Sequence, residues 1–387
     1  MTSPFTLWRD PAAPDWRNAS IEGWHYTSAV RSAEERAAIF ARSWQLVGRQ
    51  DQLCEPGDYL TCTVAGESVL VVQDGGDALH AFYNVCRHRG RELVDPWTCG
   101  RTRQLQCRYH GWVYGLDGRV RAVPDESAFP DLEAGTLGLA PLQVDVWHGL
   151  VFVKVEPGGE SLREHFDELE ECLPQAFEPA VLVAAKTLQL NANWKVAIEA
   201  FIETNHIASL HPRVSKGLRF DETAVAHLRR HSLTVLPTKL AHDWGARRRE
   251  SWRAWITDPA TSEIHYSIFP NVTVHLFVSG LTFLFRFLPD GKDPELTRLD
   301  VWTWKRLQEG ETPPPPMSMP DAMGEVFRQD YENIPFVQRG VRSRAFRGPL
   351  LNVFESRIGH FHGVVDGFLR ARGNQPDALD TSFTRTS

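Results

Sequence analysis

Two short segments of the chain place cysteine and histidine at spacings that suit metal binding. The first is Cys86-Arg-His88, and the second, Cys107-Arg-Tyr-His110, begins after eighteen intervening residues. Thiolate sulfur and imidazole nitrogen are ligands both of structural zinc ions and of iron–sulfur clusters. The four side chains therefore indicate a single centre held by two loops, either one zinc ion or one [2Fe–2S] cluster.

The division of ligand types between the two loops distinguishes these alternatives. Zinc fingers usually carry two cysteines in one half and two histidines in the other, whereas each loop here supplies one of each. The mixed arrangement matches a Rieske centre, in which two cysteines bind one iron and two histidines bind the other. Gly90 and Gly111 allow the backbone to approach such a cluster closely. We therefore predict a [2Fe–2S] cluster bound by Cys86, His88, Cys107 and His110, with zinc or a chance pattern as the alternatives.

A second group of candidate ligands lies further along the chain, at Glu199, Glu203, His206 and His211. The first three fall at helical spacing on one face of an expected helix. His211 is five residues beyond His206, which is about 140° round an ideal helix. Both imidazoles can therefore bind one metal only if the helix bulges or breaks between them. Pro212 follows directly and favours a break, because proline cannot continue the hydrogen bonds of a helix.

Two imidazoles and one carboxylate would leave positions on Fe(II) open for O₂, as in the non-haem iron oxygenases. Taken alone, a helix with two histidines and two glutamates is more often a polar face than a metal site. The iron–sulfur motif in the same chain favours the metal site. Another histidine pair, His360 and His362, has no carboxylate tied to it by the sequence pattern, and we interpret it as structural.

The residues around both groups resemble those of the catalytic α subunit of the Rieske non-haem iron oxygenases, the aromatic-ring-hydroxylating oxygenase family. Residues 84–90 and 107–112 look like that family's two cluster-binding loops. Residues 193–211 look like its N-W-K…E-x-x-H-x₄-H signature. Residues 39–48 and 149–153 resemble the opening and closing parts of its Rieske domain. The resemblance therefore extends over most of the chain.

The resemblance implies three ligands for a mononuclear iron, namely His206, His211 and an aspartate on a late helix. Residues 327–340 match the place of that helix, and Asp330 is the ligand that we predict from it, ahead of the neighbouring glutamates. One position departs from the pattern, because Pro335 stands where the family often has glutamate.

Glu203 matches a carboxylate that, in the family, links a cluster histidine of one subunit to an iron-ligating histidine of the next. The resemblance thus implies that Glu203 is an inter-subunit bridge for electron transfer, although Asn205 stands where many members have tyrosine. It also implies a homotrimer (α₃) or an α₃β₃ assembly. Electrons would come from NAD(P)H through a reductase, directly or by way of a ferredoxin.

Composition and residue patterns predict an α+β protein. Hydrophobic residues make up 42% and charged residues 24% of the chain, which suits a globular protein with a substantial core. Residues 44–155 contain short apolar runs joined by turn signals such as Asp74-Gly-Gly76, which indicate a small antiparallel β domain. Strands and helical stretches follow, with a last long helix near 320–345. The resemblance implies that this second part is a helix-grip (START-like) catalytic domain with an antiparallel sheet and long helices.

The expected domains are an N-terminal arm that packs on the catalytic domain (1–38), a Rieske [2Fe–2S] domain (39–156) and a catalytic mononuclear iron domain (157–387). A net charge of −7 argues against nucleic acid as a partner, because phosphate binding needs a basic surface. No apolar run approaches the roughly 18 residues of a membrane span, and we recognise no signal peptide. A soluble, cytoplasmic protein is therefore expected. The remaining cysteines are interpreted as buried or inert: Cys54, Cys62, Cys99 and Cys172.

Together these observations predict an oxidoreductase that uses O₂ to hydroxylate a small organic substrate, by cis-dihydroxylation, monohydroxylation or oxidative demethylation. The alternative is a Rieske electron-transfer protein with a non-catalytic helix-grip domain. The sequence favours an aromatic substrate, as in aromatic hydrocarbon catabolism, over a quaternary ammonium compound held in a cage of aromatic rings. Most aromatic residues of the catalytic half are expected to pack in the core: Trp244, Trp252, Trp255, Phe269, Phe277, Phe283 and Phe285.

Overall fold

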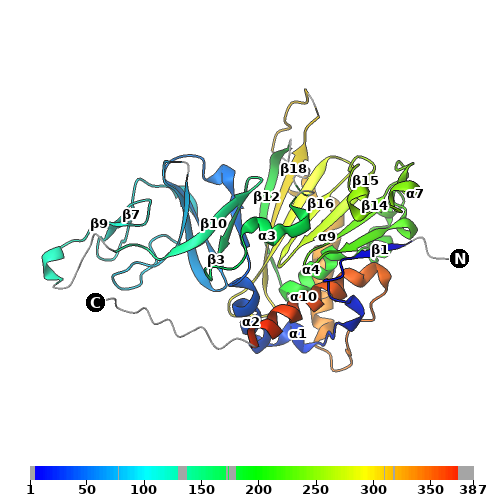
Figure 1. Cartoon of the computed structure of the whole chain (residues 1–387), viewed down its shortest axis with the longest axis horizontal. Helices are drawn as coiled ribbons and strands as arrows, with labels where there is room; N and C mark the ends of the chain where they lie inside the picture. Colours follow the sequence, from blue (N-terminus) through cyan, green and yellow to red (C-terminus); the bar gives the residue numbers. More distant parts are fainter. Residues whose placement is uncertain are drawn as a thin grey trace. The chain divides into compact units, whose positions relative to one another are not determined.

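The computed structural model describes residues 5–76, 78–129, 137–170, 173, 180–308, 310–316 and 319–373, so Cys172 lies outside the described residues. The chain divides into two compact units, a smaller one from Ile39 to Asp167 and a larger one. The larger unit joins the residues up to Ala38 to those from Glu168 onward. It is therefore discontinuous in sequence, with the smaller unit inserted after its first part (Figure 1).

The smaller unit contains two antiparallel sheets, as the sequence predicts. Its main sheet has the strand order β2-β11-β10-β5-β4-β3-β6, and a second sheet has the order β7-β8-β9. In the turn between β4 and β5, Asp74 Oδ1 accepts a hydrogen bond from Gly76 N at 2.8 Å. The strands are β2 (Gln45–Arg49), β3 (Asp58–Val64), β4 (Glu67–Gln73), β5 (Leu79–Tyr83), β6 (Cys99–Arg101), β7 (Leu105–Gln106), β8 (Val113–Tyr114), β9 (Val120–Ala122), β10 (Pro141–Trp147) and β11 (Leu150–Lys154).

Helix α3 (Leu162–Phe166) also belongs to the smaller unit, although the sequence places the domain boundary at residue 156. The ring of Phe166 stacks on Trp147 of β10, with 4.1 Å between the ring centroids. It also meets the edge of Phe152 of β11 at 5.4 Å. These contacts hold α3 against the sheet, and for this reason the compact unit extends to Asp167.

The larger unit is built on one sheet with the order β1-β13-β14-β15-β16-β17-β18-β12. From β13 to β12 all neighbours pair antiparallel. By contrast, β1 pairs parallel with β13 and places Thr6 opposite Ala224, so the N-terminal arm supplies a strand to this sheet. The strands are β1 (Thr6–Arg9), β12 (Ala180–Leu190), β13 (Ala224–His227), β14 (Ser232–Pro237), β15 (Ser262–Ile268), β16 (Val272–Leu276), β17 (Leu281–Pro289) and β18 (Thr297–Arg306).

Two helices lie together on the sheet of the larger unit. Helix α4 (Trp194–Ile202) contacts β15, β16 and β17, and α9 (Met319–Val341) contacts both α4 and β12. Alternate residues of β17 face the helices, as the period of two in a strand requires. The ring of Phe201 on α4 lies 4.6 Å from Phe285 on β17, and Phe327 on α9 lies 5.0 Å from the same ring. This aromatic layer fixes both helices over the sheet.

Helix α10 (Ser356–Gly373) is absent from the sequence prediction, which has its last long helix near 320–345. Glycine weakens helix propensity, and α10 contains several glycines. Packing explains two of them. A Cβ on Gly359 would lie 2.3 Å from the carbonyl oxygen of Trp16, and a Cβ on Gly363 would lie 2.7 Å from Pro14 Cβ. The N-terminal arm therefore packs closely on α10 because these positions have no side chain.

The arm is also held to α4 by a buried ion pair. It carries α1 (Trp24–Thr27) and α2 (Ala29–Glu35). The Nζ of Lys195 lies 2.8 Å from the carboxylate of Glu35, and both side chains are almost fully buried. The remaining short helices are α5 (Ile207–Leu210), α6 (Pro212–Ser215), α7 (Trp244–Arg247) and α8 (Trp252–Trp255). No helix in the described part of the chain is long and apolar enough to cross a membrane.

Candidate active site

Helix α4 leads directly to the candidate iron ligands and then ends. Asn193 caps its start, with the side-chain oxygen accepting a hydrogen bond from Lys195 N at 3.0 Å. The helix stops after Ile202, because Glu203 has extended backbone angles (φ −124°, ψ 167°). The next short helix, α5, is flanked by His206 and His211. The break that the sequence predicts is therefore present, but it begins before His206.

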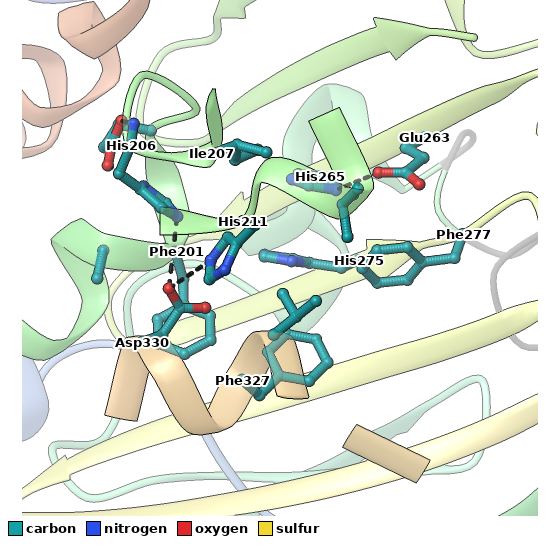
Figure 2. Close-up of a pocket in the computed structure, with 14 residues that line it drawn as sticks. Phe201, His206, Ile207, His211, Glu263, His265, His275, Phe277, Phe327 and Asp330 are labelled. Carbon is teal, nitrogen blue, oxygen red and sulfur yellow. Dashed lines mark hydrogen bonds and ion pairs between the residues drawn. The ribbon is translucent and has the colours of Figure 1, made fainter. Parts of the chain in front are cut away.

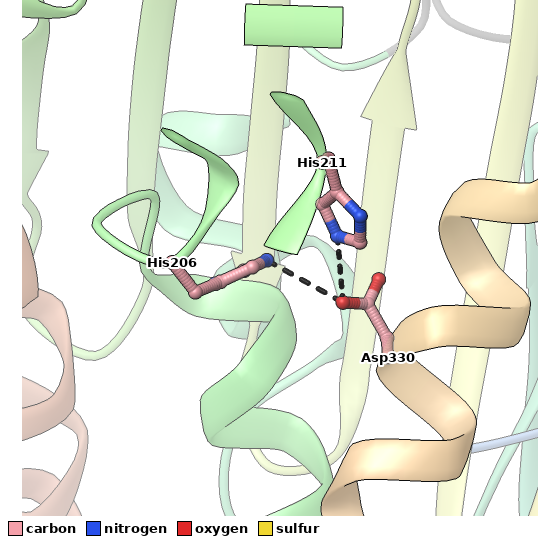
Figure 3. Close-up of side chains that lie close together, drawn as sticks. All are labelled: His206, His211 and Asp330. Atoms are coloured by element: carbon pink, nitrogen blue, oxygen red, sulfur yellow. Dashed lines mark hydrogen bonds and ion pairs between the residues drawn. The ribbon is translucent and has the colours of Figure 1, made fainter. Parts of the chain in front are cut away.

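Three side chains converge beside this break (Figure 3). The Nε2 atom of His211 lies 2.8 Å from Asp330 Oδ1 on α9, and the Nε2 atom of His206 lies 3.5 Å from the same oxygen. One ligand atom from each side chain lies within 4.8 Å of the others, and no other such group of three occurs among the described residues. Ligands at right angles, about 2.1 Å from a metal ion, are about 3 Å apart. The three predicted residues thus have the spacing that one metal ion needs.

The other ring nitrogens of the two histidines have partners that orient them. His206 Nδ1 contacts the Glu203 carboxylate, and His211 Nδ1 lies 2.8 Å from Gln329 Oε1. Such contacts hold an imidazole in the tautomer and direction that present Nε2 to a metal. Glu203 also accepts hydrogen bonds from the backbone N–H groups of Asn205 and His206. Glu203 therefore lies directly beside His206, and the linking role that the resemblance implies for it stays a prediction.

The charges at this group favour bound cations. Burial by itself lowers the pKa of His206, but its hydrogen bond to Glu203 and the charges of Glu203 and Asp330 outweigh burial and raise that pKa. Burial by itself also lowers the pKa of His211. The hydrogen bonds of His211 to Asp330 and Gln329, together with the charge of Asp330, outweigh burial and raise that pKa. Both shifts arise because carboxylates face the imidazoles. The same negative potential would stabilise a divalent metal ion at this point.

Glu199 is not part of this group, contrary to the sequence prediction that it shares a helical face with Glu203 and His206. Because α4 ends at Ile202, helical spacing does not carry past that residue. Glu199 instead accepts a hydrogen bond from Tyr26 Oη at 2.9 Å and lies 2.7 Å from His362 Nε2. His362 therefore does have a carboxylate partner, which the sequence pattern did not show.

The three converging side chains open onto a pocket in the larger unit (Figure 2). About 430 Å³ of space in and around the pocket is free of protein atoms, the open solvent at its mouth included. Phe201, Phe277 and Phe327 line it. Of the aromatic residues named from the sequence, Phe277 thus lines the pocket. The tryptophans of α7 and α8 are buried in the core: Trp244, Trp252 and Trp255.

Three polar residues of the pocket were missed by the sequence analysis. Glu263 and His265 alternate along β15, and His275 lies opposite His265 on β16. The two imidazoles stack with 4.1 Å between centroids. Burial, with Arg357 and His206 adding smaller effects, lowers the pKa of His265 to about 3. The only signal in the sequence was polar residues at every second position of a strand, which normally indicates a solvent-facing side.

In the smaller unit, the two cysteine–histidine loops share one backbone pattern. Gly90 N donates to the carbonyl oxygen of Cys86, and Gly111 N donates to that of Cys107, each at 3.0 Å. The N–H groups of both cysteines donate to a carbonyl five residues on, each at 2.9 Å. Gly90 and Gly111 have φ of +75° and +74°, a region that favours glycine. The loops therefore present their cysteine and histidine side chains in equivalent ways.

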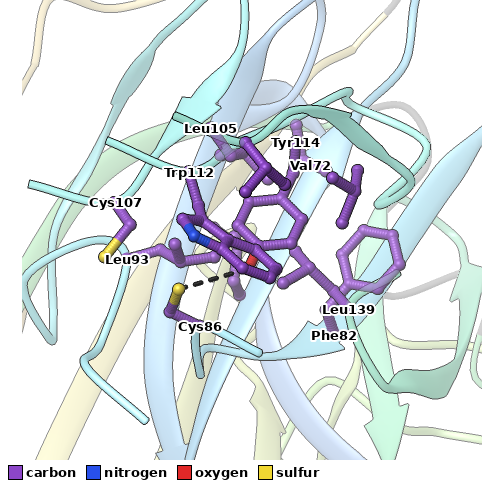
Figure 4. Packing of buried hydrophobic residues seen from close by; sticks show 12 residues of the cluster. Val72, Phe82, Cys86, Leu93, Leu105, Cys107, Trp112, Tyr114 and Leu139 are labelled. Carbon is purple, nitrogen blue, oxygen red and sulfur yellow. Dashed lines mark hydrogen bonds between the residues drawn. The ribbon is translucent and has the colours of Figure 1, made fainter. Parts of the chain in front are cut away.

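The surroundings of these loops suit an iron–sulfur cluster. Cys86 and Cys107 are buried in an apolar cluster with Trp112 and Tyr114 (Figure 4), and the Tyr114 hydroxyl lies 3.2 Å from Cys86 Sγ. Trp112 stacks on His88, with 5.2 Å between centroids. His88 Nδ1 is buried without a hydrogen-bond partner among the described residues, as expected of an atom that binds a metal.

The spacing of the four side chains also distinguishes a cluster from zinc. Within the described part of the chain, no three of Cys86, His88, Cys107 and His110 offer ligand atoms within 4.8 Å of one another. A single zinc ion would require such proximity, because each ligand lies only about 2.0–2.3 Å from it. Two iron atoms, one bound by the cysteines and one by the histidines, would not. The residues present thus fit a [2Fe–2S] cluster.

A two-loop cluster site together with a two-histidine, one-carboxylate site defines the class of Rieske-type non-haem iron oxygenases. The family model for the Rieske [2Fe–2S] domain matches residues 43–139. The model for the ring hydroxylating alpha subunit (catalytic domain) matches residues 177–371. The chain therefore belongs to the ring-hydroxylating α-subunit family, as the sequence resemblance predicts. It is an oxidoreductase that uses a Rieske cluster and a mononuclear iron.

The chain is similar to several known members along most of its length. It is 27% identical to the carnitine monooxygenase oxygenase subunit of Acinetobacter pittii over 334 residues, which cover 84% of this chain and 85% of the relative. It is 26% identical to the choline monooxygenase of Atriplex hortensis over 368 residues, 91% of this chain and 78% of the relative. These names give no support to the sequence preference for aromatic hydrocarbon substrates and dioxygenation.

Solved structures share the fold at lower identity. A quaternary ammonium Rieske monooxygenase in complex with L-carnitine superposes with a TM-score of 0.76 at 23% identity, covering 92% of this chain and 98% of that one. Naphthalene 1,2-dioxygenase from Rhodococcus sp. superposes with a TM-score of 0.74 at 17% identity, covering 92% and 95%. The α+β fold predicted from the sequence is thus confirmed.

Proposed function

We propose that this chain is the oxygenase component of a monooxygenase that hydroxylates a quaternary ammonium compound. The observation that carries the proposal is the pocket lined by Phe201, Phe277 and Phe327 beside the group of His206, His211 and Asp330. Aromatic rings attract a quaternary ammonium by cation–π interaction, at no cost in unpaired hydrogen bonds. The names of the carnitine and choline monooxygenases support the same substrate class.

In this proposal His206, His211 and Asp330 bind the mononuclear iron, which when bound activates O₂ with electrons supplied by the cluster. Glu203 and Gln329 hold the two imidazoles with Nε2 toward the metal. The phenylalanine side chains exclude water and orient the substrate beside the metal site. Orientation of this kind is a large part of what a protein contributes to a cofactor reaction.

The cluster site is assigned to Cys86, His88, Cys107 and His110. Buried sulfur and a hydrogen bond from the Tyr114 hydroxyl are two of the influences that set a cluster's potential. Glu203, beside His206, is proposed as the bridge for an electron that arrives from the cluster of a neighbouring subunit. An NAD(P)H-dependent reductase, directly or through a ferredoxin, would reduce the cluster. A homotrimer or an α₃β₃ assembly and a cytoplasmic location remain predictions.

A single-turnover experiment tests the proposal. The iron-loaded protein is reduced without air and then given ¹⁸O₂ with one of several compounds, including carnitine, choline and naphthalene. We expect a quaternary ammonium compound to accelerate reoxidation of the cluster and to gain one labelled oxygen. Two labelled oxygens in an aromatic product would overturn the proposal. A chain that forms its cluster but binds no further iron would instead support the electron-transfer alternative.

A further inference from the structure

One carboxylate in the pocket has no protein cation to neutralise it. Glu263 on β15 is 7% exposed and lines the pocket. Among the residues that the structure describes, the only basic side chain within ion-pair distance is His265, whose Nε2 lies 3.8 Å from Glu263 Oε2. Burying an ionised carboxylate without partners is strongly unfavourable. A carboxylate that is buried at this energetic cost in the wall of a pocket points to a ligand that supplies the missing positive charge.

His265 cannot supply the positive charge. Burial lowers its pKa to about 3, so it is neutral at physiological pH. The pKa of the stacked His275 is also lowered, well below its ordinary value, mainly by burial. The buried guanidinium of Arg357 donates hydrogen bonds to Ser232 Oγ and Thr234 Oγ1 on β14, and it makes no ion pair with Glu263. None of these three side chains therefore neutralises the negative charge of Glu263, which faces the pocket.

The position of Glu263 within the pocket suggests which part of a substrate it meets. Figure 2 shows Glu263 and Phe277 on the opposite side of the pocket from Asp330, with the rings of His265 and His275 between the two ends. A cation near Glu263 would have a carboxylate and an aromatic ring within the same recess. The rest of the molecule would then extend toward the candidate iron ligands.

We propose that Glu263 is the specificity-determining residue of this pocket and binds the positively charged nitrogen of an alkylammonium substrate. Phe277, at the same end, provides an apolar ring surface for the groups attached to that nitrogen. The neutral His265 and His275 leave this charge uncompensated, and their buried Nε2 atoms have no hydrogen-bond partner among the described residues. The inference deepens the proposed function and rests on it for the substrate class, but it concerns recognition and not the reaction.

An equilibrium binding experiment separates the effect of the ligand's charge from the effect of its shape. Choline and its uncharged carbon isostere, 3,3-dimethylbutan-1-ol, are titrated by calorimetry into the oxygen-free holoenzyme. The variant Glu263→Gln keeps the size of the side chain and removes its charge. Glu250→Gln, an exposed position of the same unit, is the matched control. Visible absorbance of the cluster and the iron content show whether each variant is folded and loaded.

We expect wild type to bind choline more tightly than the isostere, and Glu263→Gln to lose at least about tenfold in choline affinity. The affinity for the isostere should differ by less than about twofold between wild type and Glu263→Gln. The control Glu250→Gln should bind both compounds as wild type does. Equal binding of choline by wild type and Glu263→Gln, no preference for the cation, or no choline binding by wild type would each overturn the inference.

Turnover of choline is measured separately. Charge-dependent binding without product refutes the proposed function alone, whereas oxygenation that is unaffected by Glu263→Gln refutes the inference alone.

Discussion

The buried carboxylate of Glu263 predicts that a substitution in the pocket stabilises the protein. Burial raises the pKa of Glu263 from 4.5 to about 7. Between these pH values the folded chain keeps a proton on Glu263 that the unfolded chain has lost, so stability falls as pH rises through this range. The loss is complete above about pH 7. We expect Glu263→Gln, which has no proton to lose, to escape it.

The size of the effect follows from the shift. A change of about 2.5 pKa units corresponds to about 3 kcal/mol at 1.36 kcal/mol per unit. For a unit of this size that is roughly 6–12 °C in melting temperature. It is an upper limit, because the amide of glutamine would also be buried without partners. A residue retained at such a cost to stability is typical of a functional site.

Thermal unfolding followed by circular dichroism measures the effect. Wild type, Glu263→Gln and the exposed control Glu250→Gln are compared at about pH 8 and about pH 5, without substrate. We expect Glu263→Gln to melt several degrees above wild type at the higher pH and close to it at the lower pH. The control should follow wild type at both. If the two pH values give the same difference, Glu263 does not carry a buried, uncompensated charge, and the reasoning is refuted.

Three further predictions concern the metal site and the N-terminal arm. Asp330→Ala should no longer bind the mononuclear iron or form product, while the absorbance of the cluster is unchanged. Glu332→Ala, exposed on the same helix, should keep both the iron and the activity. Retained iron in Asp330→Ala would contradict the ligand assignment. Gln329→Leu should weaken iron binding by about 10- to 100-fold in a metal titration, because it removes the partner that orients a ligand; unchanged affinity would exclude that role. Lys195→Met should lower the free energy of unfolding by roughly 1.5–3 kcal/mol, since the buried Glu35 loses one of its two cationic partners and keeps Arg31, at 3.1 Å; adding Glu35→Gln should restore part of this loss in the same urea titration.

Sequence patterns are most informative where candidate ligands lie close together along the chain. The spacing of Cys86 to His88 and of Cys107 to His110 is set by short loops, so a pattern of types and intervals is sufficient. The same holds for His206 and His211, which flank one short helix. Asp330 required the family resemblance, because no local rule connects residues so far apart.

What the sequence did not show depends on tertiary contacts. Glu263 and His275 occupy ordinary alternating positions of strands, and only packing under α4 and α9 buries that face of the sheet. The glycines of α10 look unfavourable for a helix until the approach of Trp16 is known. Glu199 looked like a neighbour of Glu203 because periodicity cannot reveal where α4 ends. In the first two cases burial or a close approach, and not local preference, decided the outcome.

The insertion of the smaller unit within the larger one has a consequence for biosynthesis. A chain made from its N-terminus can complete residues 39–167, and with them both cysteine–histidine loops, while the rest is still being translated. The larger unit must wait, because β1 pairs with β13 and the arm packs on α10, the last helix described. The iron–sulfur cluster can therefore be installed in a finished fold before the pocket that holds Asp330 exists. The cluster site would then be assembled before the mononuclear iron site, in the order in which their residues are translated.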